Sequence, residues 1–220
     1  MKTSIDHLVI GARDLDTGID AARKWLGVEI PFGGSHKKMG THNALMKLGD
    51  DLFLEIIAVA NKMTPPKRPR WFGLDDPHIR YRIACHPTLL SWVVNTDDLA
   101  GLLEQADCAM GKAELFTRAN LHWLFSLPGD GRLIAGGMMP YAIEWLTSPH
   151  PAAAMPDLGC NLSGLVLHHN QPEWLYAALR SIGAEKLVTI QPVEHDKTPY
   201  MEALINTPGG QKIISNGHNS

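Results

Sequence analysis

The sequence is poor in cysteine, in long apolar runs and in net charge. Its 220 residues include only three cysteines, Cys85, Cys108 and Cys160, which form no CxxC pair. This excludes the disulfide framework of small secreted domains, and we expect reduced thiols in a cytoplasmic protein. No stretch approaches the ~18 uninterrupted apolar residues of a membrane helix, so a membrane partner is not expected. The formal net charge of −3 gives no electrostatic reason to expect nucleic acid either.

What the sequence does contain is one pattern of elements that recurs. Apolar segments bounded by turns predict strands, and capped segments with apolar residues at helical spacing predict helices. The order strand, helix, strand, strand, strand occurs three times, which predicts an α+β fold of three βαβββ units. The units are predicted at residues 1–60, 87–147 and 161–217, joined by a proline-rich connecting loop at 61–86 and a linker at 148–160.

The first predicted strand, in the segment SIDHLVIGARDL, carries a histidine between aliphatic residues. Alternation along the strand places His7 on one face, with Ile5 and Val9, and Asp6 on the other face. One interpretation of His7 is a core histidine that is hydrogen-bonded through its ring. The other is a ligand or proton-transfer group that faces a cavity.

Repeated units of this kind resemble the vicinal-oxygen-chelate superfamily, which includes glyoxalase I, extradiol dioxygenases and the bleomycin- and fosfomycin-resistance proteins. The segment GGSHKKMGTHNAL, residues 33–45, is similar to the GG-x-H…GT-x-N pattern of the glyoxalase-like domain branch. The resemblance implies cupped mixed β-sheets with helices on the outside. It also implies metal ligands on the first and fourth strands of each unit.

Carried over residue by residue, the resemblance implies metal ligands at His7, Glu55 and Glu144, with Glu55 and Glu144 as catalytic residues. Aligning the second unit with the first places Ser91, a poor ligand, at the position of a second histidine. A histidine and two carboxylates with water would suit a divalent ion such as zinc, nickel, manganese or iron. No organic cofactor is implied, and the third unit supplies no site residue.

Three polar residues are candidates for substrate binding. His36 and Asn43 belong to the glyoxalase-like motif, and Ser91 holds the place of the missing histidine. Two buried carboxylates need a cation, a shared proton or water beside them. An inward His7 that accompanies two inward glutamates is therefore interpreted as functional.

Three functions remain open. The first is a metal-assisted lyase or isomerase that acts on a small carbonyl-containing substrate with a glutamate as general base. The second is a metal-free protein of the bleomycin-resistance type that binds or sequesters a small molecule. The third is a scaffold whose extra unit drives assembly. A chain of three units leaves one unit without a partner, so we expect a symmetric homodimer.

Overall fold

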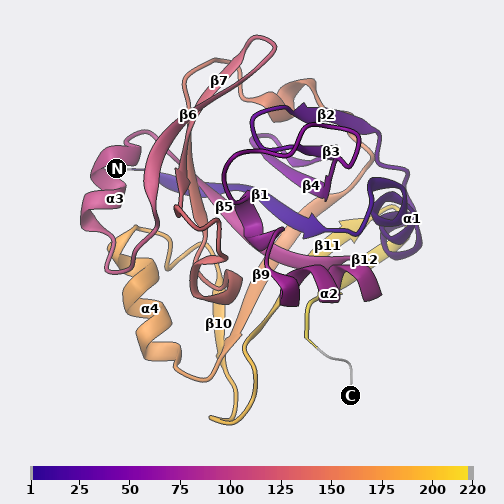
Figure 1. Cartoon of the computed structure of the whole chain (residues 1–220). Coiled ribbons are helices and arrows are strands. Elements are labelled where there is room, and N and C mark those ends of the chain that lie inside the picture. Colours follow the sequence, from indigo (N-terminus) through magenta and orange to yellow (C-terminus); the bar gives the residue numbers. More distant parts are fainter. Residues whose placement is uncertain (1, 218–220) are drawn as a thin grey trace.

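The computed structural model describes residues 2–217, which form two β-sheets with helices packed outside them (Figure 1). The predicted α+β class is confirmed. The strands are β1 (Thr3–Gly11), β2 (Phe32–His36), β3 (Thr41–Gly49), β4 (Leu52–Val59), β5 (Thr88–Thr96), β6 (Lys112–Arg118), β7 (Leu121–Leu127), β8 (Tyr141–Trp145), β9 (Asn161–His169), β10 (Thr189–Pro192), β11 (Tyr200–Thr207) and β12 (Gly210–Ser215). The helices are α1 (Leu15–Leu26), α2 (Pro77–Cys85), α3 (Leu99–Gln105) and α4 (Pro172–Ser181), with short 3-10 turns η1 (Trp71–Gly73), η2 (Ile134–Gly137) and η3 (Pro151–Ala154).

The larger sheet has eight strands in the order β2-β3-β4-β1-β5-β8-β7-β6. Its two halves meet at the centre, where β1 and β5 pair antiparallel. In each half the first strand pairs parallel with the fourth, β1 with β4 and β5 with β8. The two halves therefore share one topology, and they form a single continuous sheet.

The smaller sheet has the order β10-β9-β11-β12 and differs from both halves of the larger one. Its segment repeats the element order β9, α4, β10, β11, β12, but β9 pairs with β10 and β11, not with the last strand. The segment thus shares the sequence pattern of the first two without sharing their strand connections. The predicted boundaries of the three units stay a prediction.

Both sheets belong to one apolar core. Buried residues of the smaller sheet, among them Leu165, Leu167 and Met201, pack in the same cluster as Val9 and Ile56 of the larger sheet. The smaller sheet is thereby fixed to the larger one, and the last strands of the chain lie beside α1 in Figure 1.

Local signals set the ends of α1. The Asp14 carboxylate accepts a hydrogen bond from the backbone N–H of Thr17, which is the usual N-cap arrangement. Gly27 ends the helix with φ 73°, a left-handed conformation that glycine adopts without steric cost. These are the kinds of signal by which capped segments predict helices.

The connecting segment contains a helix that the sequence pattern did not predict. Asp76 caps α2, and Pro77 occupies its first turn, where the missing N–H has no helical partner to lose. Only Ile79 and Ile83 are buried, so the apolar periodicity is too short to stand out. No helix within residues 2–217 is long and apolar enough to cross a membrane.

Candidate functional site

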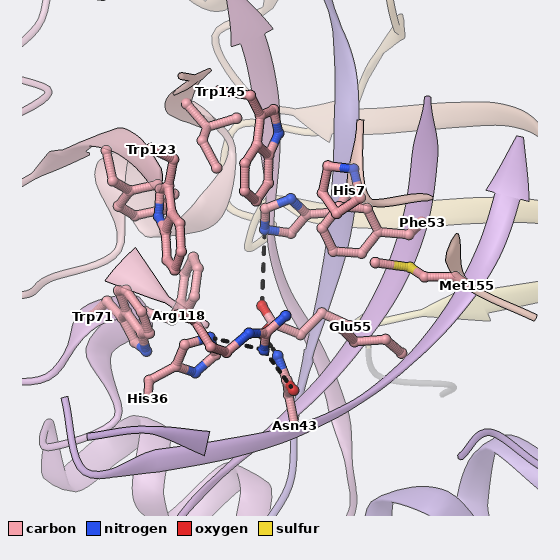
Figure 2. Close-up of a pocket in the computed structure, with 15 residues that line it drawn as sticks. His7, His36, Asn43, Phe53, Glu55, Trp71, Arg118, Trp123, Trp145 and Met155 are labelled. Carbon is pink, nitrogen blue, oxygen red and sulfur yellow. Dashed lines mark hydrogen bonds and ion pairs between the residues drawn. The ribbon is translucent and has the colours of Figure 1, made fainter. Parts of the chain in front are cut away.

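A pocket lies on one face of the larger sheet, and both halves of that sheet line it (Figure 2). It encloses about 460 Å³ of empty space, counting the part that is open to solvent. Its polar lining residues are His7, His36, Asn43, Glu55 and Arg118. Its aromatic lining residues are Phe53, Trp71, Phe72, Trp123, Phe125 and Trp145.

His7 and Glu55 face each other inside the pocket. They lie on the neighbouring parallel strands β1 and β4, and each is only 5% exposed. The His7 Nε2 atom is 3.8 Å from Glu55 Oε2 (Figure 2). The other oxygen, Glu55 Oε1, accepts a hydrogen bond of 2.6 Å from Asn43 Nδ2 on β3. Asn43 therefore fixes the carboxylate and leaves one oxygen directed toward the His7 ring.

A β-bulge brings Asp6 to the same side as His7. In the β1–β5 pair, Ile5 lies opposite Val94 and His7 opposite Val93, so Asp6 is an extra residue without a partner. Bulges re-aim side chains in this way because they break the alternation of faces. Asp6 Oδ1 lies 2.5 Å from His7 Nδ1. The predicted placement of Asp6 on the opposite face from His7 is wrong for this reason.

The Asp6 carboxylate is fully buried and accepts three side-chain hydrogen bonds. Besides His7, the donors are Trp145 Nε1 at 2.7 Å and His150 Nε2 at 3.0 Å. Burial raises the pKa of Asp6, but the hydrogen bonds from His150 and His7 outweigh it and hold the pKa below its usual value. An ionised carboxylate only accepts hydrogen bonds, so the His7 hydrogen is on Nδ1 and Nε2 is free.

The signal for Asp6 was present in the sequence as an aspartate beside a histidine in an apolar strand. Strand alternation alone cannot show that both side chains turn to one side, since a bulge depends on the partner strand. Asp6 is the residue of the candidate site that the sequence pattern missed most clearly.

His36 and Arg118 occupy matching positions at the ends of β2 and β6. Arg118 Nη1 lies 3.4 Å from His36 Nε2 and 3.4 Å from Asn43 Oδ1 (Figure 2). Burial, and after it the charge of Arg118, lowers the pKa of His36 to about 3. His36 is therefore neutral near pH 7. The structure thus brings together His7, Glu55, Asn43 and His36, four of the predicted site residues, and adds Arg118, which was not predicted.

Glu144 lies outside the pocket. Its Oε2 atom accepts a hydrogen bond of 2.9 Å from the backbone N–H of Leu99 at the start of α3. The carboxylate thereby stabilises a helix N-terminus, where an unpaired N–H and a partial positive charge favour an anion. Its neighbours on the strand, Ile143 and Trp145, are the residues of β8 that line the pocket.

The predicted placement of Glu144 beside Glu55 is wrong by one residue. His7 pairs with Phe53 on β4, and Glu55 follows two residues later. In the other half Val93 pairs with Tyr141 on β8, and Ile143 follows two residues later. A slip of one residue moves a side chain to the opposite face of a sheet.

Ser91 does not reach the pocket either. It is fully buried, and its hydroxyl donates to the backbone carbonyl of Trp92 at 3.3 Å. The residue across from His7 is Val93, an apolar side chain. The structure therefore supports neither a ligand role nor a substrate contact for Ser91.

The residues of the pocket do not fit the predicted metal. The set of His7, Glu55 and Glu144 is wrong because Glu144 is directed to α3. Within residues 2–217 no group of three His, Cys, Asp or Glu side chains is placed to hold an ion. His7 and Glu55 offer two donor atoms, whereas protein metal sites commonly use three or four. The guanidinium of Arg118 adds a positive charge to the same pocket.

Two loops complete the wall of the pocket. Trp71 and Phe72 of η1 are 3% and 2% exposed, and the Phe72 N–H donates to the hydroxyl of Tyr141 at 3.1 Å. Pro151 and Met155, from the linker after β8, close the other side. The two aromatic residues of η1 thus both pack the connecting segment onto the sheet and line the pocket.

Residues 5–183 match the model of the glyoxalase-like domain family. No curated relative matches the chain. A hypothetical protein from Staphylococcus aureus shares the fold over 98% of this chain and 85% of its own, with a TM-score of 0.61 and 13% identity. Methylmalonyl-CoA epimerase from Mycobacterium tuberculosis is similar over 68% of this chain and 91% of its own, with a TM-score of 0.43 and 19% identity. A mutant of 4-hydroxymandelate synthase from Streptomyces coelicolor is similar over 97% of this chain and 62% of its own, with a TM-score of 0.48 and 13% identity.

The family model covers most of the chain, including both halves of the larger sheet. The resemblance indicated by residues 33–45 is thereby confirmed, and the chain belongs to the glyoxalase-like domain family.

Proposed function

We propose that the pocket catalyses proton transfer on a small carbonyl-containing compound, as an isomerase or lyase, with Glu55 as general base. One observation supports this proposal most. Glu55 Oε2 and His7 Nε2 are free atoms that face each other at 3.8 Å, while Asn43 and Asp6 hold the other ends of the two side chains. A base held on one side and free on the other is suited to general acid–base chemistry.

The proposed reaction needs only groups of this chain. The C–H bond next to the substrate carbonyl breaks, the proton moves to Glu55 Oε2, and the electron pair moves to the carbonyl oxygen. His7 Nε2 can take the proton on from Glu55, because the ring hydrogen is on Nδ1 and the Asp6 anion stabilises the imidazolium. Return of a proton to the opposite face of the same carbon inverts its configuration, and return to a different carbon moves the carbonyl group, so either outcome isomerises the substrate. Loss of a leaving group from the neighbouring carbon, as the electron pair re-forms the carbonyl, makes the reaction a lyase step.

Deuterium exchange tests the proposal with simple carbonyl compounds in place of the natural substrate. The protein is incubated in D₂O with 2-oxo acids, β-keto acids and simple ketones, and the α-proton signals are followed by NMR. We expect the wild type to accelerate the exchange of at least one class. Glu55→Gln and His7→Ala should each reduce that acceleration by about 10²-fold or more.

His78→Ala serves as the matched control, since His78 is an exposed histidine on α2 that does not line the pocket. Its exchange rate should equal that of the wild type. Equal exchange by Glu55→Gln and the wild type would contradict the proposal, as would the failure of every class to exchange faster with protein than without it.

A binding protein is the second candidate, and the aromatic wall of the pocket favours it. Six aromatic residues line the pocket, and such surfaces hold flat apolar ligands without any chemistry. A binding protein should keep its ligand affinity in Glu55→Gln. In that case a thermal-shift screen would find ligands of both the wild type and the variant, and neither would exchange protons.

A further inference from the structure

A second cavity adjoins the pocket. Leu45, Arg118, Pro151 and Met155 line both, so the two spaces meet along these side chains. The second cavity, here called the outer groove, encloses about 1120 Å³ of empty space, counting the part open to solvent. Apolar residues dominate its remaining wall, among them Pro31, Phe32, Leu121, Pro149, Ala154 and Pro156.

Phe32 shows that the groove presents apolar surface to solvent. Its side chain is 62% exposed at the start of β2. An exposed phenyl ring next to several prolines gives an apolar ligand a favourable place to bury its surface. The groove therefore suits the apolar part of a ligand, whereas the pocket holds the groups proposed for the chemistry.

Arg118 stands where the two spaces meet and has no carboxylate partner among the described residues. Its nearest polar contacts are the long ones to His36 Nε2 and Asn43 Oδ1, both at 3.4 Å. Arginines of the adjacent connecting segment differ. Arg68 pairs with Glu114 and Arg70 with Asp75, each at 2.5 Å.

The environment of Arg118 favours a bound anion. Burial disfavours the charged form and lowers the pKa of Arg118, while the charge of Glu55 partly opposes this shift, and a guanidinium remains protonated in proteins. A half-buried cation without a partner recovers its lost hydration energy when an anion binds to it. Carboxylates match the planar fork of the guanidinium and can accept two parallel hydrogen bonds.

We propose that the pocket and the outer groove form one site for an amphipathic monocarboxylate, and that Arg118 is its carboxylate-binding residue. This inference rests on the proposed function, because it assigns the substrate class of the same site. The carboxylate lies at the junction, the carbonyl group and the C–H bond beside it extend toward Glu55, and the apolar chain or ring lies in the outer groove. One anionic group matches the single unpaired cation of the junction.

Three probes separate the contributions of charge and chain. Octanoate carries both features, octanamide has the chain without the charge, and acetate has the charge without the chain. Isothermal titration calorimetry measures their affinities. We expect octanoate to bind about 10-fold or more tightly than octanamide, because hydrogen bonds to a charged group are the stronger ones. It should also bind at least about 10-fold more tightly than acetate, because the groove buries methylene groups.

Variants assign each preference to its residue. Arg118→Gln should abolish the preference for octanoate over octanamide, and Arg118→Lys should restore part of it because the charge remains. Phe32→Ala should narrow the gap between octanoate and acetate while keeping the preference for the anion. Arg132→Gln is the control, since Arg132 is exposed, pairs with Asp130 and lines neither cavity.

Equal octanoate affinity of Arg118→Gln and the wild type, with both folded by circular dichroism, would overturn the assignment of Arg118. Equal affinity of the wild type for acetate and octanoate would overturn the role of the groove. These binding measurements leave His7 and Glu55 intact. Proton exchange that persists in Glu55→Gln therefore refutes the proposed function alone, and anion binding that persists in Arg118→Gln refutes this inference alone.

Discussion

The two halves of the larger sheet have the same strand topology and line one pocket with different chemistry. The first half, β1 to β4, contributes His7, Asn43 and Glu55, and the second half, β5 to β8, contributes mainly aromatic and aliphatic side chains. Equivalent positions hold Glu55 in one half and Ile143 in the other. A symmetric fold can thus carry an asymmetric site, with most of the polar side chains on one side and, apart from Arg118 of β6, an apolar wall on the other.

The largest expected effect on stability comes from placing in the second half the glutamate that the first half has at the equivalent position. Ile143→Glu would bury a carboxylate among aromatic rings at a position that is 2% exposed. We expect the free energy of unfolding at pH 7 to fall by about 3 kcal/mol or more, because the new charge has no partner. Urea denaturation measures the loss. Leu115→Glu, at a 53% exposed position on β6, is the control and should be nearly neutral. A stable Ile143→Glu variant would show that the second half tolerates ionisable groups.

The next effect concerns the carboxylate that joins the two halves. Asp6→Asn keeps the shape of the side chain but replaces an acceptor oxygen by an N–H₂ group, which faces the donors of Trp145 and His150. The expected cost is about 2 kcal/mol in the free energy of unfolding, because buried donors lose their acceptor. Proton exchange should fall as well. Asp130→Asn, at an exposed ion pair, is the control. If Asp6→Asn were as stable as the wild type, the negative charge of Asp6 would not be needed to stabilise the β-bulge.

The pH dependence of stability reports on the partly buried imidazole of His36 in the first half. His36 has a pKa of about 3 in the folded chain and an ordinary value of 6.5 when unfolded. Between these values the unfolded chain binds more protons, so the free energy of unfolding falls as the pH falls. The slope from this group is at most about 1.4 kcal/mol per pH unit. Urea titrations at pH 7 and pH 5 should show a smaller drop for His36→Gln than for the wild type or for His78→Gln. If the free energy of unfolding of His36→Gln fell between pH 7 and pH 5 by as much as that of the wild type, the neutral state of His36 would be contradicted.

A smaller effect is expected from Trp145, where the contribution of the indole hydrogen bond can be distinguished from that of the aromatic ring. Trp145→Phe keeps an aromatic side chain and removes the bond from Nε1 to Asp6. We expect a loss of about 1 kcal/mol, the usual contribution of one hydrogen bond. Trp123→Phe makes the same change on the neighbouring strand without removing a bond to Asp6. Thermal denaturation measures the stability of both variants. If Trp145→Phe and Trp123→Phe lose the same stability, the loss is due to the smaller ring and not to the hydrogen bond.

The smallest expected effect is that of metal chelation. His7 and Glu55 of the first half face each other with two donor atoms, and within residues 2–217 no group of three His, Cys, Asp or Glu side chains is placed to hold an ion. Removal of divalent ions by EDTA should therefore leave the melting temperature and the rate of proton exchange unchanged. Elemental analysis of protein purified without chelator checks the same point. Near-stoichiometric metal that disappears in His7→Ala would contradict the two-donor description.

The sequence carried much of the fold because the signals were local. Asp14 and Gly27 mark the ends of α1, and alternating apolar residues mark the central strands. The order of strands in the smaller sheet was not predictable in the same way. Whether β9 pairs with β10 or with a later strand depends on contacts between distant segments, and an element order does not contain them.

The site was predictable where it followed regular strand geometry. His7 and Glu55 lie on an uninterrupted parallel strand pair, as the resemblance to the vicinal-oxygen-chelate superfamily implied. Asp6 escaped because a bulge overrides alternation. Glu144 was misplaced because the start of β8 is fixed by its pairing with β5, not by similarity of letters to β4. Arg118 was not predicted as a site residue because its strand, β6, is largely exposed. Only the folded sheet brings the end of β6 beside His36.

The bulge at Asp6 has a consequence for anyone who would redesign this pocket. One buried carboxylate orients the ring of His7, ties β8 to β1 through Trp145, and anchors the linker through His150. The orientation of His7 and the attachment of β8 and the linker to β1 thus depend on the same carboxylate. A substitution of Asp6 would disturb all of them together. Variant libraries that seek new substrates should leave His7, Trp145 and His150 unchanged. They should also keep Asp6, which accepts their hydrogen bonds. Substitutions belong in the outer groove, at positions such as Phe32 and Leu121, where the wall can change shape while the arrangement of His7 and Glu55 proposed for proton transfer stays as it is.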